Sequence, residues 1–297
     1  MANRASKTAW GPIVQVAFEQ FVPQPQRIIQ DAFAYRFLPT PLRWFVNIGR
    51  SGALRNRLFA LIDRRVPGIR GGILCRKRYI DDTLVKSLSQ GLRNLVILGA
   101  GMDTLAYRNP EISTLQVYEV DLPEIIDAKK AVLIRLFGKI PDSVRLVPID
   151  FDRQELGAAL YETGYSHESK SFFVWEGVTQ YITEAVVGEV FEFLKNASQG
   201  SRLVFTYIRK DFIDGQKMYD LDVLYRQTRL KKEFWQFGMQ PDEVDGFLET
   251  YGWRELEQAG SAEYQQRYLQ PVGRIMPVME VERSVYARKV NGFRRKN

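Results

Sequence analysis

The sequence N-L-V-I-L-G-A-G-M-D-T-L-A-Y-R, residues 94–108, contains the features that decide the fold. Residues 95–98 form an apolar run, Gly99-Ala100-Gly101 interrupts it, and a segment able to form a helix begins near Asp103. This order is typical of a buried strand, a tight turn and a helix start. Glycine suits the turn because the chain reverses there while a flat ligand lies against its backbone, where a Cβ atom would collide.

A carboxylate follows the next predicted strand. Residues 116–120 alternate as a strand does, and Asp121 ends it 22 residues after Gly99. A carboxylate at this spacing suits the hydroxyls of a ribose, so the two segments predict a nucleoside-containing cofactor at the carboxyl edge of a parallel sheet. Thr104 replaces the third glycine of a dinucleotide motif, and Asp103 would repel a pyrophosphate at the helix start. The cationic methionine end of S-adenosylmethionine would not be repelled, which favours this cofactor over NAD.

Four ordered motifs extend this pattern along the chain. They are L-G-A-G-M-D-T-x-x-Y-R from residue 98, Y-E-V-D-x-P from 118, V-P-x-D from 147 and W-E-G-V-x-x-Y-I from 175. Their order and spacing resemble the leucine carboxyl methyltransferase family, over about residues 25–289. The family includes bacterial O-methyltransferases of polyketide pathways. The resemblance therefore implies an enzyme that uses S-adenosylmethionine and releases S-adenosylhomocysteine.

The resemblance also implies the fold class: α/β, a Rossmann-like class I methyltransferase with a seven-stranded, mostly parallel sheet and an antiparallel last strand. From residue 94 onward, strand patterns alternate with helix patterns, whereas residues 1–90 show apolar residues at helical spacing. We predict a helical N-terminal cap over residues 1–90 and a methyltransferase domain over 91–297. Within the cap, Gly71-Gly72 is expected to be a break, followed by a helix over about residues 74–90.

An aromatic stretch interrupts the alternation at about residues 208–240. It is too long for a simple connection, and such insertions commonly shape an acceptor pocket. Packing of an extra helix pair explains the same composition equally well, so both interpretations stay open. The residues concerned are Phe212, Met218, Tyr219, Tyr225, Phe234, Trp235 and Phe237.

The resemblance assigns roles that the motifs alone leave open. Arg76 would hold the cofactor carboxylate with its guanidinium fork. Asp150 and Phe151 would contact the adenine, while Glu176 and Tyr181 would face the sulfonium and amino group. A helix-start carboxylate and a core aromatic are the structural alternatives for Glu176 and Tyr181. The predicted catalytic residues are Glu176 and Tyr181, and the predicted cofactor-binding residues are Arg76, Gly99, Ala100, Gly101, Asp103, Asp121, Leu122, Asp150, Phe151 and Glu176.

The sequence offers few side chains that could act as a general base, and this bears on which group accepts the methyl. Methyl transfer is an in-line displacement, for which a protein mainly positions two atoms and excludes water. A carboxylic acid is already ionised at pH 7, whereas a phenol or alcohol must lose a proton. His167 is the only histidine and lies in a polar stretch typical of an exposed loop. We therefore predict methyl-ester formation on a small acidic molecule, and the family resemblance implies one of polyketide type; methylation of a hydroxyl, with Glu176 as base, stays open. Gln180, more polar than expected, is a candidate to contact the acceptor.

Composition sets further bounds. With 297 residues, 45% hydrophobic and 26% charged, the chain suits one large α/β domain with additions, or two domains. A single cysteine and a single histidine exclude an intrachain disulfide and a site of several histidines, so no metal is predicted. No apolar run approaches the ~20 residues of a membrane span. Gln15, Glu19 and Gln20 interrupt any signal-peptide core, so we expect a cytoplasmic protein without a membrane partner.

The net charge of +7 is partly concentrated in one segment, from Arg64 to Arg78. A solvated helix face is the preferred interpretation, and nucleic acid is not the expected partner. The alternative from another functional class is a protein that binds or modifies tRNA. In that case the basic segment would contact the tRNA backbone. An NAD-dependent dehydrogenase is the remaining alternative.

Overall fold

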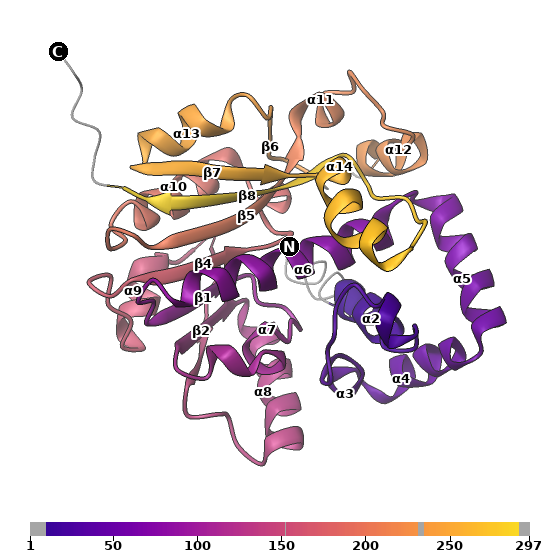
Figure 1. The fold of residues 1–297 in the computed structure, drawn as a ribbon. Coiled ribbons are helices and arrows are strands. Elements are labelled where there is room, and N and C mark those ends of the chain that lie inside the picture. The colour runs from indigo at the N-terminus through magenta and orange to yellow at the C-terminus, as the bar shows by residue number, and fades with distance from the viewer. Residues whose placement is uncertain (1–9, 152, 231–234, 291–297) are drawn as a thin grey trace.

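Strands and helices alternate from residue 94 onward and build one sheet with helices on both faces (Figure 1). The computed structural model describes residues 10–151, 153–230 and 235–290. The strands are β1 (Asn94–Leu98), β2 (Gln116–Asp121), β3 (Val144–Pro148), β4 (Ser171–Trp175), β5 (Arg202–Arg209), β6 (Gly238–Met239), β7 (Trp253–Ala259) and β8 (Glu282–Lys289).

The strand order is β3-β2-β1-β4-β5-β8-β7, with β6 paired to β5. β1 to β5 are mutually parallel, and β8 enters antiparallel between β5 and β7. The predicted α/β class, with its antiparallel last strand, is confirmed. The two-residue strand β6 was not expected, because a strand of that length leaves no alternation to detect.

Two apolar cores lie on opposite faces of this sheet. Leu95 and Ile97 of β1 join one core, together with helices α2 (Trp10–Glu19) and α6 (Ile69–Leu88). Val96 and Leu98 join the other, which holds residues of α9 (Leu156–Glu162), α10 (Glu184–Leu194) and α13 (Val244–Thr250). Successive side chains of a strand point to opposite faces, so a strand covered on both sides must be apolar throughout.

The described part of the first 90 residues contains helices and no strand. Besides α2 and α6 it holds α3 (Ala34–Phe37), α4 (Thr40–Asn47) and α5 (Gly52–Arg65). In Figure 1 the arrow of β7 points toward α2, α3, α4 and α5, which lie beyond that edge of the sheet. β7 runs in the same direction as β5, because both are antiparallel to β8. These helices therefore stand at the carboxyl edge of the parallel strands. The division of the chain at residue 90 stays a prediction, since α6 packs against both α2 and β8.

The expected break at Gly71-Gly72 is wrong. Helix α6 begins at Ile69, directly after Gly68 in a left-handed conformation with φ +77°. A Cβ atom on Gly71 would lie 2.2 Å from the carbonyl oxygen of Pro277. Both glycines are helical. At Gly71 the absence of a side chain lets the distant loop approach closely, and a local sequence pattern does not reveal such a contact.

The remaining helices are short, apart from α8 (Pro123–Phe137), which starts at a proline. Thr183 caps α10 by accepting a hydrogen bond from the Val186 backbone N–H, a role that threonine commonly has before a helix. None of the described helices is long and apolar enough to cross a membrane. The others are α7 (Leu105–Arg108), α11 (Lys210–Ile213), α12 (Asp222–Leu230) and α14 (Ser261–Tyr264).

Candidate functional site

The glycine turn after β1 is held on the neighbouring strand. The backbone N–H groups of Gly99 and Ala100 donate to the carbonyl of Val120 at 2.8 and 2.9 Å. Gly99 has φ +70°, and a Cβ there would lie 2.3 Å from Cγ2 of Val178. Glycine is thus required by the protein's own packing as well as by its backbone conformation.

Asp121 at the end of β2 ties this turn to the sheet. Its Oδ2 accepts a hydrogen bond from the Gly101 backbone N–H at 2.6 Å, and its Oδ1 accepts one from Leu122 at 2.7 Å. Burial raises the pKa of the Asp121 carboxyl, and the two N–H donors oppose that rise. Each carboxylate oxygen keeps a second lone pair, which is directed at neither of these donors.

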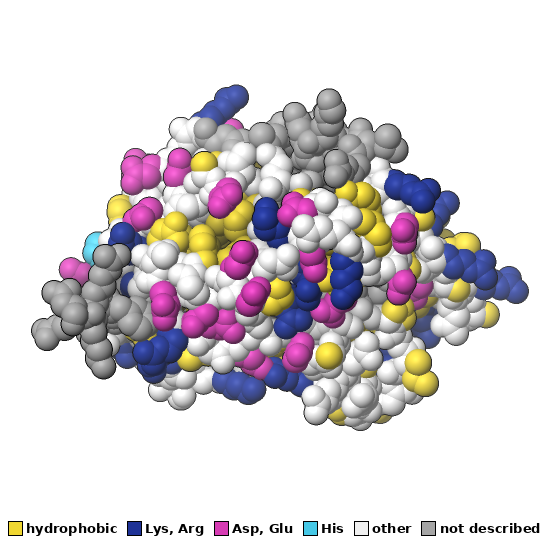
Figure 2. Space-filling model, turned by 90° about the horizontal axis from the view of Figure 1, so that it is seen from above, with side chains coloured by type: hydrophobic (Ala, Val, Ile, Leu, Met, Phe, Trp, Pro, Cys, Tyr) yellow, Lys and Arg dark blue, Asp and Glu magenta, His cyan; other side chains and the backbone are white. Residues whose placement is uncertain are grey.

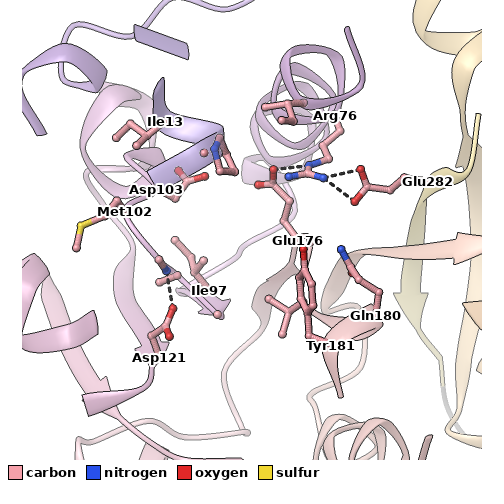
Figure 3. Close-up of a pocket in the computed structure, with 18 of the residues that line it drawn as sticks. Ile13, Arg76, Ile97, Met102, Asp103, Asp121, Glu176, Gln180, Tyr181 and Glu282 are labelled. Atoms are coloured by element: carbon pink, nitrogen blue, oxygen red, sulfur yellow. Dashed lines mark hydrogen bonds and ion pairs between the residues drawn. The ribbon is translucent and has the colours of Figure 1, made fainter. Parts of the chain in front are cut away.

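One cavity of about 1720 Å³ opens at the carboxyl ends of the strands. Every predicted site residue lines it, and Figure 3 shows Asp121 on one side with Arg76, Glu176 and Tyr181 on the other. The lining residues that were predicted from the sequence are Arg76, Gly99, Ala100, Gly101, Asp103, Asp121, Leu122, Asp150, Phe151, Glu176 and Tyr181. Their assembly in one cavity makes the predicted site geometrically possible; their individual roles stay predictions.

Arg76 lies between two carboxylates (Figure 3). Its Nε donates to Glu176 Oε1 at 2.6 Å, and its Nη1 donates to both carboxylate oxygens of Glu282 at 2.5 Å. Burial opposes the charge of Arg76, but the two glutamates outweigh it and raise the pKa of the guanidinium. Two of its three nitrogens are therefore already engaged by the protein.

The ion pairs continue from Glu176 toward the glycine turn. Lys77 Nζ contacts the Asp103 carboxylate and lies 3.2 Å from Glu176 Oε2. Arg108 contacts Asp103 at 2.7 Å and Asp81 at 2.6 Å. Burial acts to raise the pKa of Asp103 and of Glu176, but the neighbouring cations lower both pKa values further than burial raises them. Both carboxylates are consequently ionised, and Asp103 faces two protein cations.

A second buried pair supports the turn from behind. Lys129 of α8 and Glu119 of β2 are fully buried and their charged atoms lie 2.5 Å apart. The Tyr107 hydroxyl donates to Glu119 at 2.5 Å, and Lys129 Nζ lies 3.4 Å from the Ala100 carbonyl. Sequence reasoning missed this pair, although a glutamate inside an apolar strand and a lysine on the apolar side of a helix are visible signals.

Much of the remaining lining of the cavity is apolar. Its walls come from the N-terminal helices, from the end of β5 and from the segment before β8. Gln180 also lines it, as suggested from the sequence. The apolar lining residues from these segments are Ile13 and Val16 of α2, Ile62 of α5, Ile69 and Ile73 of α6, and Ile208, Leu224, Trp235 and Met279. We call this set the apolar arm.

In the aromatic stretch at residues 208–240, one side chain lines the cavity and others pack in apolar cores, so each of the two interpretations holds for part of it. Trp235 lines the cavity and also packs against Phe212, which is buried in a small third core with Tyr219 and Tyr225 around it. Phe237 belongs to the core of the main sheet. Phe234 lies outside the described residues. Within the part described, the stretch supplies one aromatic wall residue, and its other aromatic side chains pack in the small core or in the core of the main sheet.

The basic segment from Arg64 to Arg78 is a solvated face only in part, since Arg64 and Arg65 are exposed. Arg70, Arg76 and Lys77 are buried, and Arg70 pairs with Asp63 at 3.0 Å. Figure 2 shows basic and acidic side chains intermingled on the face it draws. Half of the segment's cations are buried and paired with carboxylates. The RNA-binding alternative depended on all of them being available to a tRNA backbone, so it loses support. His167 lies in an exposed loop, as expected.

A family model described as "Leucine carboxyl methyltransferase" matches residues 9–195. Among relatives, a protein of Mycobacterium avium (strain 104), provisionally described as an S-adenosyl-L-methionine-dependent methyltransferase, is 34% identical over 138 residues, covering 46% of each chain. YktD of Bacillus subtilis (strain 168), with the same provisional description, is 35% identical over 136 residues, covering 45% of this chain and 44% of its own. The chain thus spans about half the length of the curated relatives it matches.

Solved structures agree on the fold. A provisionally named methyltransferase from Thermobifida fusca YX superposes with a TM-score of 0.55 at 16% identity, covering 80% of this chain and 89% of its own. A DUF574 family protein from Streptomyces avermitilis MA-4680 gives a TM-score of 0.51 at 13% identity, with coverage of 78% and 88%. At these identities the likeness concerns the fold alone.

Proposed function

The chain belongs to the leucine carboxyl methyltransferase family, and from this premise we propose that it transfers a methyl group from S-adenosylmethionine to a carboxylate oxygen of a small, largely apolar acid. One observation carries the proposal: the glycine turn and Asp121 share a single cavity with the apolar arm. Pockets for one drug-sized ligand commonly measure about 300–1,000 Å³. The cavity is larger than this range, which supports a donor and an acceptor side by side.

The donor set suits S-adenosylmethionine. Asp121 would accept hydrogen bonds from the ribose hydroxyls with the lone pairs that Gly101 and Leu122 leave unused. Asp150 and Phe151 would take the adenine at the end of β3, where both line the cavity. The ion-paired residues around Arg76 would receive the amino-acid end. When bound there, the cofactor supplies an electrophilic methyl group; relatives described as dependent on it support this assignment.

The ionisable groups near the reacting end favour an acceptor that is already an anion. Glu176 is held ionised with a lowered pKa by Lys77 and Arg76, against the effect of burial, so it is a weak proton acceptor. Burial raises the pKa of the Tyr181 hydroxyl, which therefore stays protonated. The chain's own contribution at this end is positioning and exclusion of water, which is what an ionised carboxylate requires.

The test is methyl transfer to a panel of small acceptors, followed by mass spectrometry. We expect purified protein with S-adenosylmethionine to add one methyl group to apolar carboxylic acids such as octanoic and naphthoic acid. The products should be esters, which mild alkali cleaves, while phenols and alcohols of the same carbon skeleton should react more slowly. If all products were alkali-stable ethers, the acceptor group would be a hydroxyl and not a carboxylate. A protein that binds the cofactor and methylates neither class would contradict the proposal.

A further inference from the structure

Helix α5 carries a stripe of apolar side chains that face solvent. Leu54, Leu58 and Leu61 are spaced four and three residues apart, so they lie on one face of the helix. Leu54 and Leu61 are 48% and 58% exposed, and none of the residues of α5 is buried. Figure 1 shows α5 at the outer margin of the molecule, away from the sheet. A helix placed in this way leaves its apolar stripe available to a partner.

Helix α4, which precedes α5, adds to the exposed apolar surface. Phe45 of α4 and Phe59 of α5 both contact Phe18, with ring centroids 5.4 and 5.7 Å apart, so both helices pack on the same residue of α2. Trp44 of α4 is 74% exposed, and Ile48, which lies between the two helices, is 44% exposed. Exposed apolar side chains are therefore concentrated within residues 44–61.

Four exposed arginines accompany the stripe: Arg50, Arg57, Arg64 and Arg65. The last three follow a leucine of the stripe by three or four residues, so they lie on its side of the helix. Among the residues that the structure describes, none of the four arginines forms an ion pair. The single acid of α4 and α5, Asp63, pairs with the buried Arg70 and does not offset them. We call the stripe and the four arginines the α5 face.

An apolar stripe beside uncompensated arginines matches the surface of a bilayer with acidic headgroups. Leucine side chains enter the boundary between headgroups and acyl chains, and arginines at the same depth contact lipid phosphates. A second copy of the chain fits less well, because two copies of the α5 face would place arginines against arginines. RNA would engage the arginines but would gain nothing from the leucines.

We propose that the α5 face docks on the surface of membranes that contain anionic phospholipids. Such docking needs no spanning segment, and none of the described helices provides one. It departs from the sequence-based expectation of no membrane partner, which considered spanning and signal segments alone. The docking does not depend on the proposed function. Ile62 and Arg65 of α5 also line the cavity, so a docked protein would hold the cavity next to the bilayer, where apolar acids accumulate.

Co-sedimentation of the full chain with lipid vesicles tests the proposal. The vesicles consist of phosphatidylcholine alone, or of phosphatidylcholine mixed with an equal amount of phosphatidylglycerol. We expect the native protein to bind the mixed vesicles more tightly than the neutral ones by at least about tenfold, because each arginine near an anionic surface contributes about a factor of five. Binding should weaken steeply as the salt concentration rises.

A pair of double variants tests the charge of the α5 face. Arg57→Gln/Arg64→Gln should weaken binding to the mixed vesicles by about 25-fold, since two arginines are lost. Lys130→Gln/Lys195→Gln is the matched control, because it removes the same charge from exposed side chains of α8 and α10. The control should retain the affinity to within about twofold, since these lysines lie outside the α5 face.

A pair of single variants tests the apolar stripe. Leu61→Ser should weaken binding to the mixed vesicles by about tenfold, because the side chain no longer enters the acyl boundary. Leu256→Ser is its control: Leu256 is 44% exposed on β7, an element away from α5 in Figure 1, and its loss should leave the affinity unchanged.

Several results would overturn the inference. A native protein that does not sediment with the mixed vesicles, or binds neutral vesicles equally well, would refute it without any variant. Losses in the controls as large as those in the α5 variants would assign binding to overall charge. A dimer in sedimentation equilibrium that Leu61→Ser dissociates would assign the face to a second copy. Binding of tRNA that Arg57→Gln/Arg64→Gln abolishes, without vesicle binding, would assign it to RNA.

Discussion

Replacement of Asp121 by alanine is expected to weaken the binding of S-adenosylmethionine by about 100-fold or more, since hydrogen bonds to a charged group contribute about 1.5–3 kcal/mol each. The carboxylate stands at the end of β2, where its two oxygens accept from Gly101 and Leu122 and are proposed to accept from the ribose. Its loss removes the ribose contacts and also releases one anchor of the glycine turn. Calorimetric titration of the variant measures the change directly.

Two further variants separate these effects. Asp121→Asn retains an oxygen for the Gly101 N–H but loses the charge, so its affinity should lie between that of the native protein and that of Asp121→Ala. Asp127→Ala removes an exposed carboxylate from α8 and should leave the affinity unchanged. Circular dichroism should show the same helix content for all three. An Asp121→Ala variant that binds the cofactor as tightly as the native protein would reject the site.

Replacement of Lys129 by methionine is expected to lower the free energy of unfolding by about 3–5 kcal/mol, the usual cost of removing one partner from a buried ion pair. Glu119 would then stay charged without a cation or take up a proton, and both are unfavourable inside the core. Burial raises the pKa of Glu119 and Lys129 counteracts this, so the lysine is what favours its charged form. Urea unfolding monitored by tryptophan fluorescence gives the change in stability.

The neighbouring Lys130 provides the control, because it is exposed on the same helix. Lys130→Met should change the stability by less than about 0.5 kcal/mol, as most surface substitutions do. Adding Glu119→Gln to Lys129→Met should restore part of the loss, since the remaining side chain is neutral and still accepts from Tyr107. If Lys129→Met were as stable as Lys130→Met, the buried pair would have no structural role.

Local patterns were sufficient for much of the fold. Apolar runs ended by glycine or aspartate predicted β1 and β2, and Thr183 before α10 is a start signal of the same local kind. These signals are local because the backbone conformation and the capping group lie within a few residues of each other. The motif residues also met in one cavity, since parallel strands place their carboxyl ends at one edge.

Other features depend on contacts between distant parts of the chain. Glu282 reaches Arg76 because β8 inserts beside β5, and no pattern near either residue indicates this pairing. The loop at Pro277 packs directly on Gly71 inside α6. The apolar arm combines helices from the first third of the chain with residues beyond 200. Sequence periodicity shows that such residues are apolar but not which of them face a cavity.

The crystal structure of the protein with S-adenosylhomocysteine tests the central claim most directly, namely that the glycine turn and Asp121 form a nucleoside site. We predict that the ribose hydroxyls bind the Asp121 carboxylate, with the adenine beside Phe151 and the amino-acid end at Arg76. A nucleoside bound elsewhere on the protein, or a cavity closed by the protein's own side chains at saturating ligand, would contradict it.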